Sequence, residues 1–279
     1  YESKLFSSYE LIGNSKNIVN ITDQIKKISV TESRVFISGP SGSGKELIAR
    51  KIHKASIRNN NPFVVLNGAL LDFNKYELEL FGEEKENGSI SYGALEKANK
   101  GTLLIDQVSE IPLDIQSKIL RVLTDQKFKR VNGSNDVSVD VRLICSSSKD
   151  LKKEIEIGNF REDLFHRINV FEINIEPLNQ RISDIPLLIK YFSKKISENY
   201  KIKELDIDEN NSYILNHNWH GNVRELRNLI ERIAILQPDS KDKISNIIKE
   251  SLKNTNFDDQ LAENSLSVPL KEAREKFEK

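Results

Sequence analysis

The sequence predicts an α/β fold in which a parallel sheet is covered by helices, followed by a small all-helical segment. Short apolar runs rich in β-branched residues alternate with stretches of helical periodicity as far as residue 175. Beyond Pro177 the strand pattern stops and helical patterns remain. A glycine-rich loop also lies between the first apolar run and the next helix, which is the arrangement of a phosphate-binding loop.

The apolar runs and the periodic stretches define the expected elements. The expected strands are residues 34–38, 63–66, 102–105 and 139–144. The expected helices lie within residues 1–30 and at 47–53, 113–123, 185–199 and 221–236. In the first helix, isoleucines recur at the spacing of one helix face, at Ile18, Ile21, Ile25 and Ile28. Short strands that alternate with helices are typical of a parallel sheet with helices on both faces.

Composition narrows the class of protein. Of the 279 residues, 38% are hydrophobic and 30% are charged, as in ordinary globular proteins. Because 42 basic residues balance 42 acidic ones, no overall charge attracts nucleic acid or membrane, and DNA contact requires a local patch or another domain. A single cysteine, Cys145, excludes an internal disulfide framework. With no apolar run near the ~20 residues that span a bilayer, we expect a cytoplasmic protein without membrane contact.

The sequence is expected to be part of a longer protein, because it contains no methionine. We expect a further domain before Tyr1. The polar, acidic stretch 254–267 is expected to be a linker, and residues 268–279 are expected to begin a helical domain.

The firmest functional signal is the phosphate-binding loop, which is expected to bind ATP. Its glycines allow backbone N–H groups to point at phosphate oxygens, and its lysine adds a positive charge near the terminal phosphates. Glu46 stands where the general motif has a serine or threonine for Mg²⁺, and Leu47 lies in the helix that follows. The loop residues are Gly39, Pro40, Ser41, Gly42, Ser43, Gly44 and Lys45.

A strand that ends in an acid should complete the phosphate site. Residues 103–105 lead into Asp106, the expected ligand for Mg²⁺ or its water. The next residue is ordinarily a glutamate that polarises the attacking water, but here it is Gln107. An amide can hydrogen-bond a water but cannot accept its proton, so we expect slow or absent hydrolysis. The alternative is that another acid, such as Glu110, compensates.

Longer motifs identify a family. They are residues 39–46, 79–82, 118–123, 160–167 and 219–226. Together they resemble the central domain of bacterial sigma-54-dependent enhancer-binding regulators, in order from about Leu11 to Leu236. The resemblance implies an AAA+ P-loop NTPase core over residues 1–175 and a helical lid over 176–250. It also explains Glu46, because this family has Gly-Lys-Glu in its phosphate loop.

The resemblance implies roles for further residues. Asn67 matches the asparagine that switches the catalytic glutamate, although its partner here is Gln107. Arg161 and Arg167 match the fingers that reach the ATP of a neighbouring subunit, and Arg224 matches the arginine of the lid that senses nucleotide. The resemblance further places adenine against residues 11–13, which include Ile12 and Gly13. The polar nucleotide sensor falls at Ser147 and Ser148.

One segment departs from the family pattern. Active members carry a Gly-Ala-Phe-Thr-Gly-Ala loop that contacts sigma-54, whereas residues 83–92 are shorter and lack its aromatic tip. Together with Gln107, this loss points to a domain that no longer remodels sigma-54 polymerase. The alternative is ordinary loop variation.

The same pattern resembles the nitrogen-regulation response regulators of this family. Such regulators carry a receiver domain before the AAA+ domain and a Fis-type helix-turn-helix after it, whose start would fall within residues 251–279. The resemblance implies ATP or ADP with Mg²⁺ as cofactors, self-association through the AAA+ domain, a sensor histidine kinase as partner and DNA as target. Sigma-54 is not expected to be a partner. The rival expectation is an active ATPase that remodels sigma-54 polymerase as a ring.

Two remaining features are expected to be structural. His217 and His220 have a metal-like spacing, but no cysteine or further histidine accompanies them, so a packing or capping role is expected. Cys145 lies in an apolar run and is expected to be a small core residue.

Overall fold

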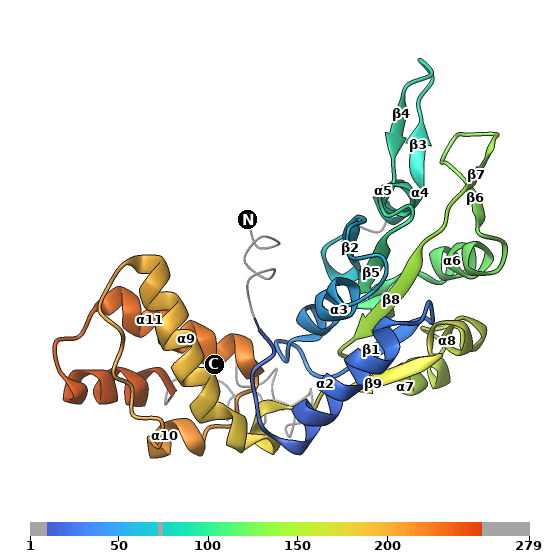
Figure 1. Ribbon diagram of the computed structural model, residues 1–279. Helices are drawn as coiled ribbons and strands as arrows, with labels where there is room; N and C mark the ends of the chain where they lie inside the picture. Colours follow the sequence, from blue (N-terminus) through green and yellow to red (C-terminus); the bar gives the residue numbers. More distant parts are fainter. Residues whose placement is uncertain (1–9, 72–74, 253–279) are drawn as a thin grey trace, which may run out of the picture. The chain divides into compact units, whose positions relative to one another are not determined.

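The computed structural model describes residues 10–71 and 75–252 (Figure 1). The chain divides after Arg181 into two compact units, which are described separately. The expected linker at 254–267 and the helical start at 268–279 lie outside the described residues, as does the beginning of the first expected helix. Among the helices of the described segments, none combines the length and the apolar character needed to cross a bilayer.

The first unit is built on a five-stranded sheet in which all neighbouring strands are parallel. Its order is β2-β5-β8-β1-β9, and because the strands are parallel, each connection crosses over the sheet. This confirms the predicted α/β class. The strands are β1 (Val35–Ser38), β2 (Phe63–Asn67), β5 (Thr102–Asp106), β8 (Arg142–Ser147) and β9 (Phe171–Asn174).

The strand expected at 139–144 was placed too early. Strand β8 begins at Arg142, and its six residues are all buried, including Ser146 and Ser147. Because serine is polar, the apolar run used to predict the strand ended before these residues. They nevertheless lie in the strand, which is enclosed by β5 on one side and β1 on the other. Val139 precedes the strand, where its N–H donates to the carbonyl of Gln126 at 3.1 Å. Strand β9 was missed because it has only four residues and its polar Glu172 and Asn174 interrupt the apolar run by which the other strands were recognised.

Helices cover both faces of the sheet, as predicted. Side chains alternate between faces along each strand, so Ile144 packs in one core and its neighbour Cys145 in the other. Helices α2 (Lys16–Ser29) and α3 (Lys45–Lys54) bury their isoleucines on the first face. The opposite face is covered by α4 (Tyr76–Phe81), α5 (Ala94–Lys97), α6 (Leu113–Asp125), α7 (Leu151–Glu156) and α8 (Glu162–Ile168).

Local sequence explains the ends of α2. Ser15 caps its N-terminus by accepting a hydrogen bond from the N–H of Ile18 at 3.3 Å. Lys26 and Lys27 lie in its last turn, where cations favour the negative end of the helix dipole. The isoleucine stripe expected from the sequence is buried, with Ile18 and Ile21 each 1% exposed.

Two antiparallel hairpins extend from the first unit (Figure 1). One consists of β3 (Gly82–Glu84) and β4 (Ile90–Tyr92), and the other of β6 (Lys127–Lys129) and β7 (Asp136–Ser138). They contact each other because the N–H of Glu84 donates to the carbonyl of Val131 at 3.0 Å. Short 3-10 turns follow or precede the main elements, at η1 (Gly68–Leu70), η3 (Val108–Glu110) and η4 (Leu178–Gln180).

Among the described residues of the second unit, every regular element is a helix, as expected for the predicted lid. It contains η5 (Ile182–Asp184), α9 (Ile185–Tyr200), α10 (Ser212–Leu215) and α11 (Asn222–Leu236), and residues 241–252 are helical as well. Helices α9 and α11 pack through buried faces that include Leu188 and Leu226.

A buried polar cluster organises the start of α11. His217 Nε2 lies 2.7 Å from Glu225 Oε1, and the other carboxylate oxygen accepts the N–H of Gly221 at 2.9 Å. The ring of Trp219 packs edge-on against His217, with 4.8 Å between centroids, and its Nε1 donates to the carbonyl of Ile214. Of the packing or capping role expected for His217, the structure shows the packing role.

The core position of Ile144 gives a stability prediction. We expect Ile144→Ala to lower the free energy of unfolding by about 2–5 kcal/mol, because it leaves a cavity in a fully buried strand. Val170→Ala is the control, since Val170 is 58% exposed and its loss should change stability by no more than about 0.5 kcal/mol. Urea denaturation followed by circular dichroism measures both. Equal losses in the two variants would contradict the placement of β8 in the core.

The polar cluster of α11 predicts a pH-dependent stability. Burial raises the pKa of Glu225, but the hydrogen bonds from His217 and Gly221 and the charges of both histidines outweigh it, so the pKa lies below its ordinary value. Ionised Glu225 therefore stabilises the second unit above the ordinary carboxyl pKa of about 4, and the stabilisation is lost as pH falls through the lowered value. At pH 7, Glu225→Gln should cost about 1–3 kcal/mol.

Trp219 provides the measurement, because it is the single tryptophan of the sequence and is 1% exposed beside this cluster. Urea unfolding followed by its fluorescence should show a gap between wild type and Glu225→Gln at pH 7 that narrows on acidification. The exposed Glu209→Gln serves as control and should change little. A gap that is the same at pH 7 and below pH 4 would contradict the role of the ionised carboxylate.

Candidate functional site

The phosphate loop connects the end of β1 to the start of α3, and its glycines are required by geometry. Gly42 and Gly44 have φ of 74° and 110°, in the left-handed region that side chains rarely adopt. A Cβ on Gly39 would lie 2.3 Å from the side chain of Ile175 and 2.6 Å from its carbonyl oxygen. The loop is therefore held tightly against the chain that follows β9.

The lysine of the loop is directed back over it. Lys45 is 6% exposed, and its Nζ donates to the carbonyls of Gly39 at 2.8 Å and Pro40 at 3.0 Å. Ser43 Oγ donates to the same Pro40 carbonyl at 2.7 Å. Gly44 caps α3 without a side-chain hydrogen bond, so the first N–H groups of this ten-residue helix remain directed at the loop. A buried ammonium and a helix N-terminus at one loop fit a phosphate group.

Arg181 supports the loop, and sequence analysis did not identify it. Its Nη2 donates to the carbonyl of Ser43 at 3.3 Å and its Nε to the carbonyl of Glu176 at 3.0 Å. The side chain is 3% exposed, so the bonds are shielded from water. Nothing in the sequence marks this arginine, because these two hydrogen bonds go to backbone carbonyls, and that of Ser43 is distant along the chain.

Glu46 does not occupy the position of a metal ligand in this conformation. Its Oε1 accepts from Arg50 Nε at 2.9 Å and Nη2 at 2.7 Å, one turn along α3. The guanidinium of Arg50 in turn lies 4.8 Å from the ring centre of Phe63. Glu46 and Arg50 therefore form an ion pair on the surface of their own helix, and Leu47 beside them is partly buried.

Asp106 and Asn67 lie side by side at the ends of adjacent strands. Their Cα positions are in register between β2 and β5, and Asn67 Nδ2 is 3.5 Å from Asp106 Oδ2. Ser146 Oγ donates to the other oxygen, Oδ1. The carboxylate of Asp106 is therefore oriented by donors from the strands on both sides of it. Gly68 is required here, since a Cβ on it would lie 2.5 Å from the carbonyl oxygen of Gln107.

Gln107 is fixed in both backbone and side chain. Its φ is 56°, a left-handed conformation that costs a non-glycine residue about 1–2 kcal/mol. Its Oε1 accepts hydrogen bonds from the Ser148 N–H at 3.0 Å and from Ser148 Oγ at 2.8 Å. Ser148 follows directly after β8, at the position expected for the polar sensor, whereas Ser147 is still inside the strand.

Glu110, the alternative acid, has partners of its own. Its Oε1 lies 2.9 Å from Lys149 Nζ and accepts from Ser109 Oγ at 3.2 Å. The hydrogen bond to Glu110 raises the pKa of Lys149. In this conformation Glu110 is therefore part of an ion pair.

The other residues expected in the site lie at different places. Ile12 and Gly13 are partly buried before α2. Asn17 of this helix is tied to the last residue of β9, because its Nδ2 donates to the Asn174 carbonyl at 3.0 Å. Arg161 precedes α8 as its N-cap residue and Arg167 lies in the last turn of the helix, and both are exposed. Arg161 donates twice to Asp163, at 3.0 and 2.7 Å.

Arg224 lies in α11 of the second unit. Within the first unit, the structure brings together the phosphate loop, Asn67, Asp106 and Gln107 at the carboxyl edge of the sheet.

Cys145 is not part of this chemistry. It is 1% exposed in the core behind the site, and burial raises the pKa of its thiol well above the usual range. The thiol therefore stays protonated, and the core role expected for Cys145 is confirmed.

The departing segment 83–92 forms the β3–β4 hairpin. The N–H of Gly88 donates to the carbonyl of Lys85 at 2.8 Å and closes a turn in which Gly88 has φ of 80°. At its base, a Cβ on Gly82 would lie 2.3 Å from the Ser91 carbonyl oxygen, so the strands approach closely. The segment is a short, closed hairpin bonded to the chain that follows β6.

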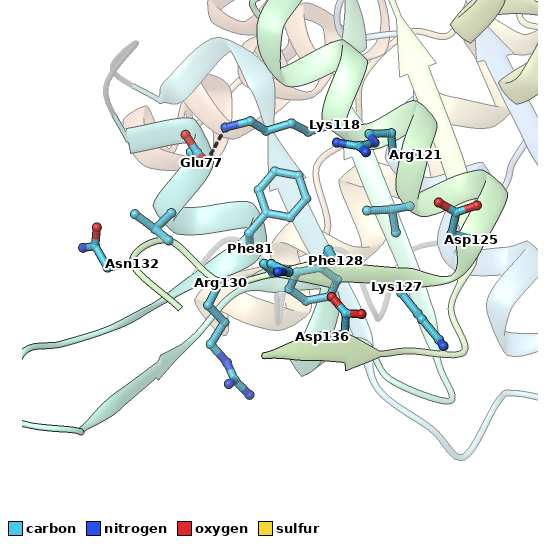
Figure 2. A pocket seen from close by; sticks show the side chains of 13 residues that line it. Glu77, Phe81, Lys118, Arg121, Asp125, Lys127, Phe128, Arg130, Asn132 and Asp136 are labelled. Atoms are coloured by element: carbon cyan, nitrogen blue, oxygen red, sulfur yellow. Dashed lines mark hydrogen bonds and ion pairs between the residues drawn. The ribbon is translucent and has the colours of Figure 1, made fainter. Parts of the chain in front are cut away.

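A groove of about 870 Å³ lies beside this hairpin, between α4, α6 and the β6–β7 hairpin (Figure 2). Phe81 and Phe128 lie within it, with ring centroids 5.5 Å apart. Figure 2 shows cationic and anionic side chains around it, among them Arg121 and Asp125, and the pairing of Lys118 with Glu77. None of its lining residues belongs to the phosphate loop, so the groove is separate from the candidate site.

Comparisons with known proteins agree with this geometry. Residues 11–174 match the model of the sigma-54 interaction domain, and residues 179–264 match that of the AAA+ ATPase lid domain. The nitrogen assimilation regulatory protein NtrX of Azorhizobium caulinodans is 41% identical over 99% of this chain and 62% of its own length. A putative NtrX-like response regulator of Rickettsia typhi is 40% identical over 100% of this chain and 60% of its own length.

Solved structures show the same relationship. The crystal structure of NtrX from Brucella abortus in complex with ADP has a TM-score of 0.81 and 42% identity, covering 97% of this chain and 61% of that one. The structure of the same protein with ATP has a TM-score of 0.80 and 41% identity, covering 100% and 63%. The chain thus spans less than two thirds of the length of these relatives. Since one family model matches more than half of it, the chain belongs to the sigma-54 interaction domain family of AAA+ proteins and resembles NtrX regulators over nearly its whole length.

Proposed function

We propose that this chain is the ATP-binding AAA+ module of a two-component, DNA-binding transcriptional regulator of the NtrX type. The observation that carries the proposal is the phosphate loop, in which Lys45, the glycines and the N-terminus of α3 meet at one place. Crystal structures of the similar Brucella abortus NtrX with ADP and with ATP support it.

The residues present fit a nucleotide with Mg²⁺. The loop residues and the first turn of α3 would hold the phosphates, and residues 12–13 would contact the base. Asp106 would hold the ion or its water, because its carboxylate is oriented by Ser146 and Asn67. No cluster of three or more metal-ligating side chains exists among the described residues, so phosphate oxygens and water would supply the remaining ligands. The bound ion would neutralise charge on the phosphates.

Weak or absent hydrolysis is the second part of the proposal. Gln107 cannot act as a general base, because an amide does not accept a proton near neutral pH. Glu110, the nearest alternative along the chain, is paired with Lys149. The site is therefore built to bind ATP and has lost the group that would activate the attacking water.

Self-association would follow from the arginines. Arg161 and Arg167 lie on exposed surface, where they can reach a nucleotide held by a neighbouring subunit. Arg161 would then exchange its ion pair with Asp163 for a phosphoryl group. Arg224 would sense nucleotide from the lid of the same subunit. Nucleotide binding would thus shift subunit packing and control the regulator.

The partners of the whole protein belong to the proposal as well. We expect a cytoplasmic regulator with a receiver domain that takes a phosphoryl group from a sensor histidine kinase, and a Fis-type domain that binds DNA. Sigma-54 is not expected to be a partner, because the β3–β4 hairpin replaces the loop that active family members use for this contact. The rival function is a ring-forming ATPase that remodels sigma-54 polymerase, in line with the family to which the chain belongs.

Nucleotide binding can be tested by calorimetric titration with ATP and ADP in the presence of Mg²⁺. Lys45→Ala should weaken both affinities by about tenfold or more, because a cationic hydrogen bond to phosphate is lost. Lys54→Ala is the matched control, since Lys54 is exposed in the last turn of the same helix. Absence of binding to the wild type at millimolar nucleotide would make the domain a structural module and refute the proposal.

Steady-state phosphate release separates the proposed function from its rival. We expect release by the wild type to stay close to that of Lys45→Ala, since neither has a general base that can act with bound ATP. Turnover that is well above background and is abolished by Lys45→Ala would establish the active ATPase instead.

A further inference from the structure

The orientation of the Gln107 amide follows from its contact with Ser148. A backbone N–H can only donate, so the Gln107 atom that lies 3.0 Å from the Ser148 nitrogen must be the oxygen, Oε1. This contact settles the assignment of oxygen and nitrogen, which is otherwise ambiguous for an amide. The hydroxyl of the same serine also donates to Oε1, at 2.8 Å.

These two bonds change what Gln107 can offer to a ligand. An amide oxygen has two lone pairs, and Ser148 supplies two donors to them. The remaining polar group of the side chain is its NH₂, which donates and cannot accept. Gln107 is partly exposed and lies on the same edge of the sheet as the phosphate loop, because Ser38 and Ser147 are in register between β1 and β8.

We propose that the NH₂ group of Gln107, positioned by Ser148, donates a hydrogen bond to the γ-phosphate and thereby makes this site prefer ATP to ADP. The proposal rests on the proposed function, which places the nucleotide phosphates on the loop. A γ-phosphate presents oxygen acceptors to the NH₂ group, whereas ADP has no such oxygens at that position. Ser148 acts through Gln107, because its two hydrogen bonds occupy the amide oxygen and so direct the NH₂ group toward the ligand. Ser148 itself need not contact the ligand.

The same arrangement opposes hydrolysis beyond the lack of a base. A water that attacks phosphorus must keep a lone pair free and give its hydrogens to an acceptor. A donor-only group offers no acceptor for those hydrogens, so Gln107 positioned by Ser148 does not orient a water for attack. The backbone supports this, since the N–H of Glu110 donates to the Gln107 carbonyl at 3.0 Å and fixes the turn after the strand.

The experiment measures the dissociation constants of ATP and ADP, with Mg²⁺, for wild type, Gln107→Leu, Ser148→Ala and the control Ser138→Ala. Ser138 lies on the β6–β7 hairpin and is exposed. We expect wild type and the control to bind ATP more tightly than ADP. Gln107→Leu should weaken ATP by roughly tenfold and leave ADP unchanged, so the preference disappears. Ser148→Ala should reduce the preference by about threefold, because one of the two bonds that orient the amide is lost.

The ADP affinity separates the possible failures. If wild type binds neither nucleotide, the proposed function fails. A second outcome is that the wild type binds both nucleotides while Gln107→Leu weakens the affinities for ATP and ADP equally, or weakens neither. That result overturns the proposed hydrogen bond from Gln107 to the γ-phosphate but leaves the nucleotide-binding function standing. An unchanged preference in Ser148→Ala overturns the positioning role of Ser148. Retained ADP binding in each variant shows that the loop and the fold are intact.

Discussion

The candidate site depends on the parallel pairing of β8 with β5 on one side and with β1 on the other. Parallel strands end at the same edge of a sheet, so the groups that follow β1, β5 and β8 meet although they are far apart in sequence. The register Ser38 to Ser147 sets the level of the phosphate loop against the serines of β8. The register that pairs Asn67 with Asp106 places the asparagine of β2 beside the carboxylate at the end of β5. A shift of one residue would turn these side chains to the opposite face.

Burial of the central strand explains why its polar end is so fully bonded. All six residues of β8 are buried, and a buried hydroxyl without a partner is costly. Ser146 therefore bonds Asp106, and Ser147 bonds Ser109 and the Lys149 carbonyl. Each hydrogen bond gives a buried serine hydroxyl a partner and also fixes the position of the group that it contacts. Ser146 donates to one carboxylate oxygen of Asp106, and Ser148, directly after the strand, donates twice to the amide oxygen of Gln107. The groups available to a ligand are the remaining lone pairs of Asp106 and the NH₂ of Gln107.

The two hairpins of the first unit are held by contacts that lie outside the candidate site. The β3–β4 hairpin is closed by Gly88 and is bonded to the chain after β6 through Glu84 and Val131. Arg130 adds a bidentate ion pair with Glu96 at 2.9 and 2.6 Å, both side chains being largely shielded. The Glu84–Val131 hydrogen bond joins the two hairpins, and the Arg130–Glu96 pair ties the β6–β7 hairpin to α5. None of these contacts involves the phosphate loop, Asp106 or Gln107.

By itself, the sequence determined the α/β class, the phosphate loop, the acid Asp106 and the family, because each depends on local patterns: apolar period, glycine spacing and motif order. It did not place β8 correctly, since Ser146 and Ser147 are strand residues only because two strands enclose them. It did not reveal Arg181, which donates hydrogen bonds to backbone carbonyls. The presence of Gln107 was evident from sequence, but the direction of its amide was decided by Ser148. That contact joins the ends of two strands, and only the tertiary fold brings those ends together.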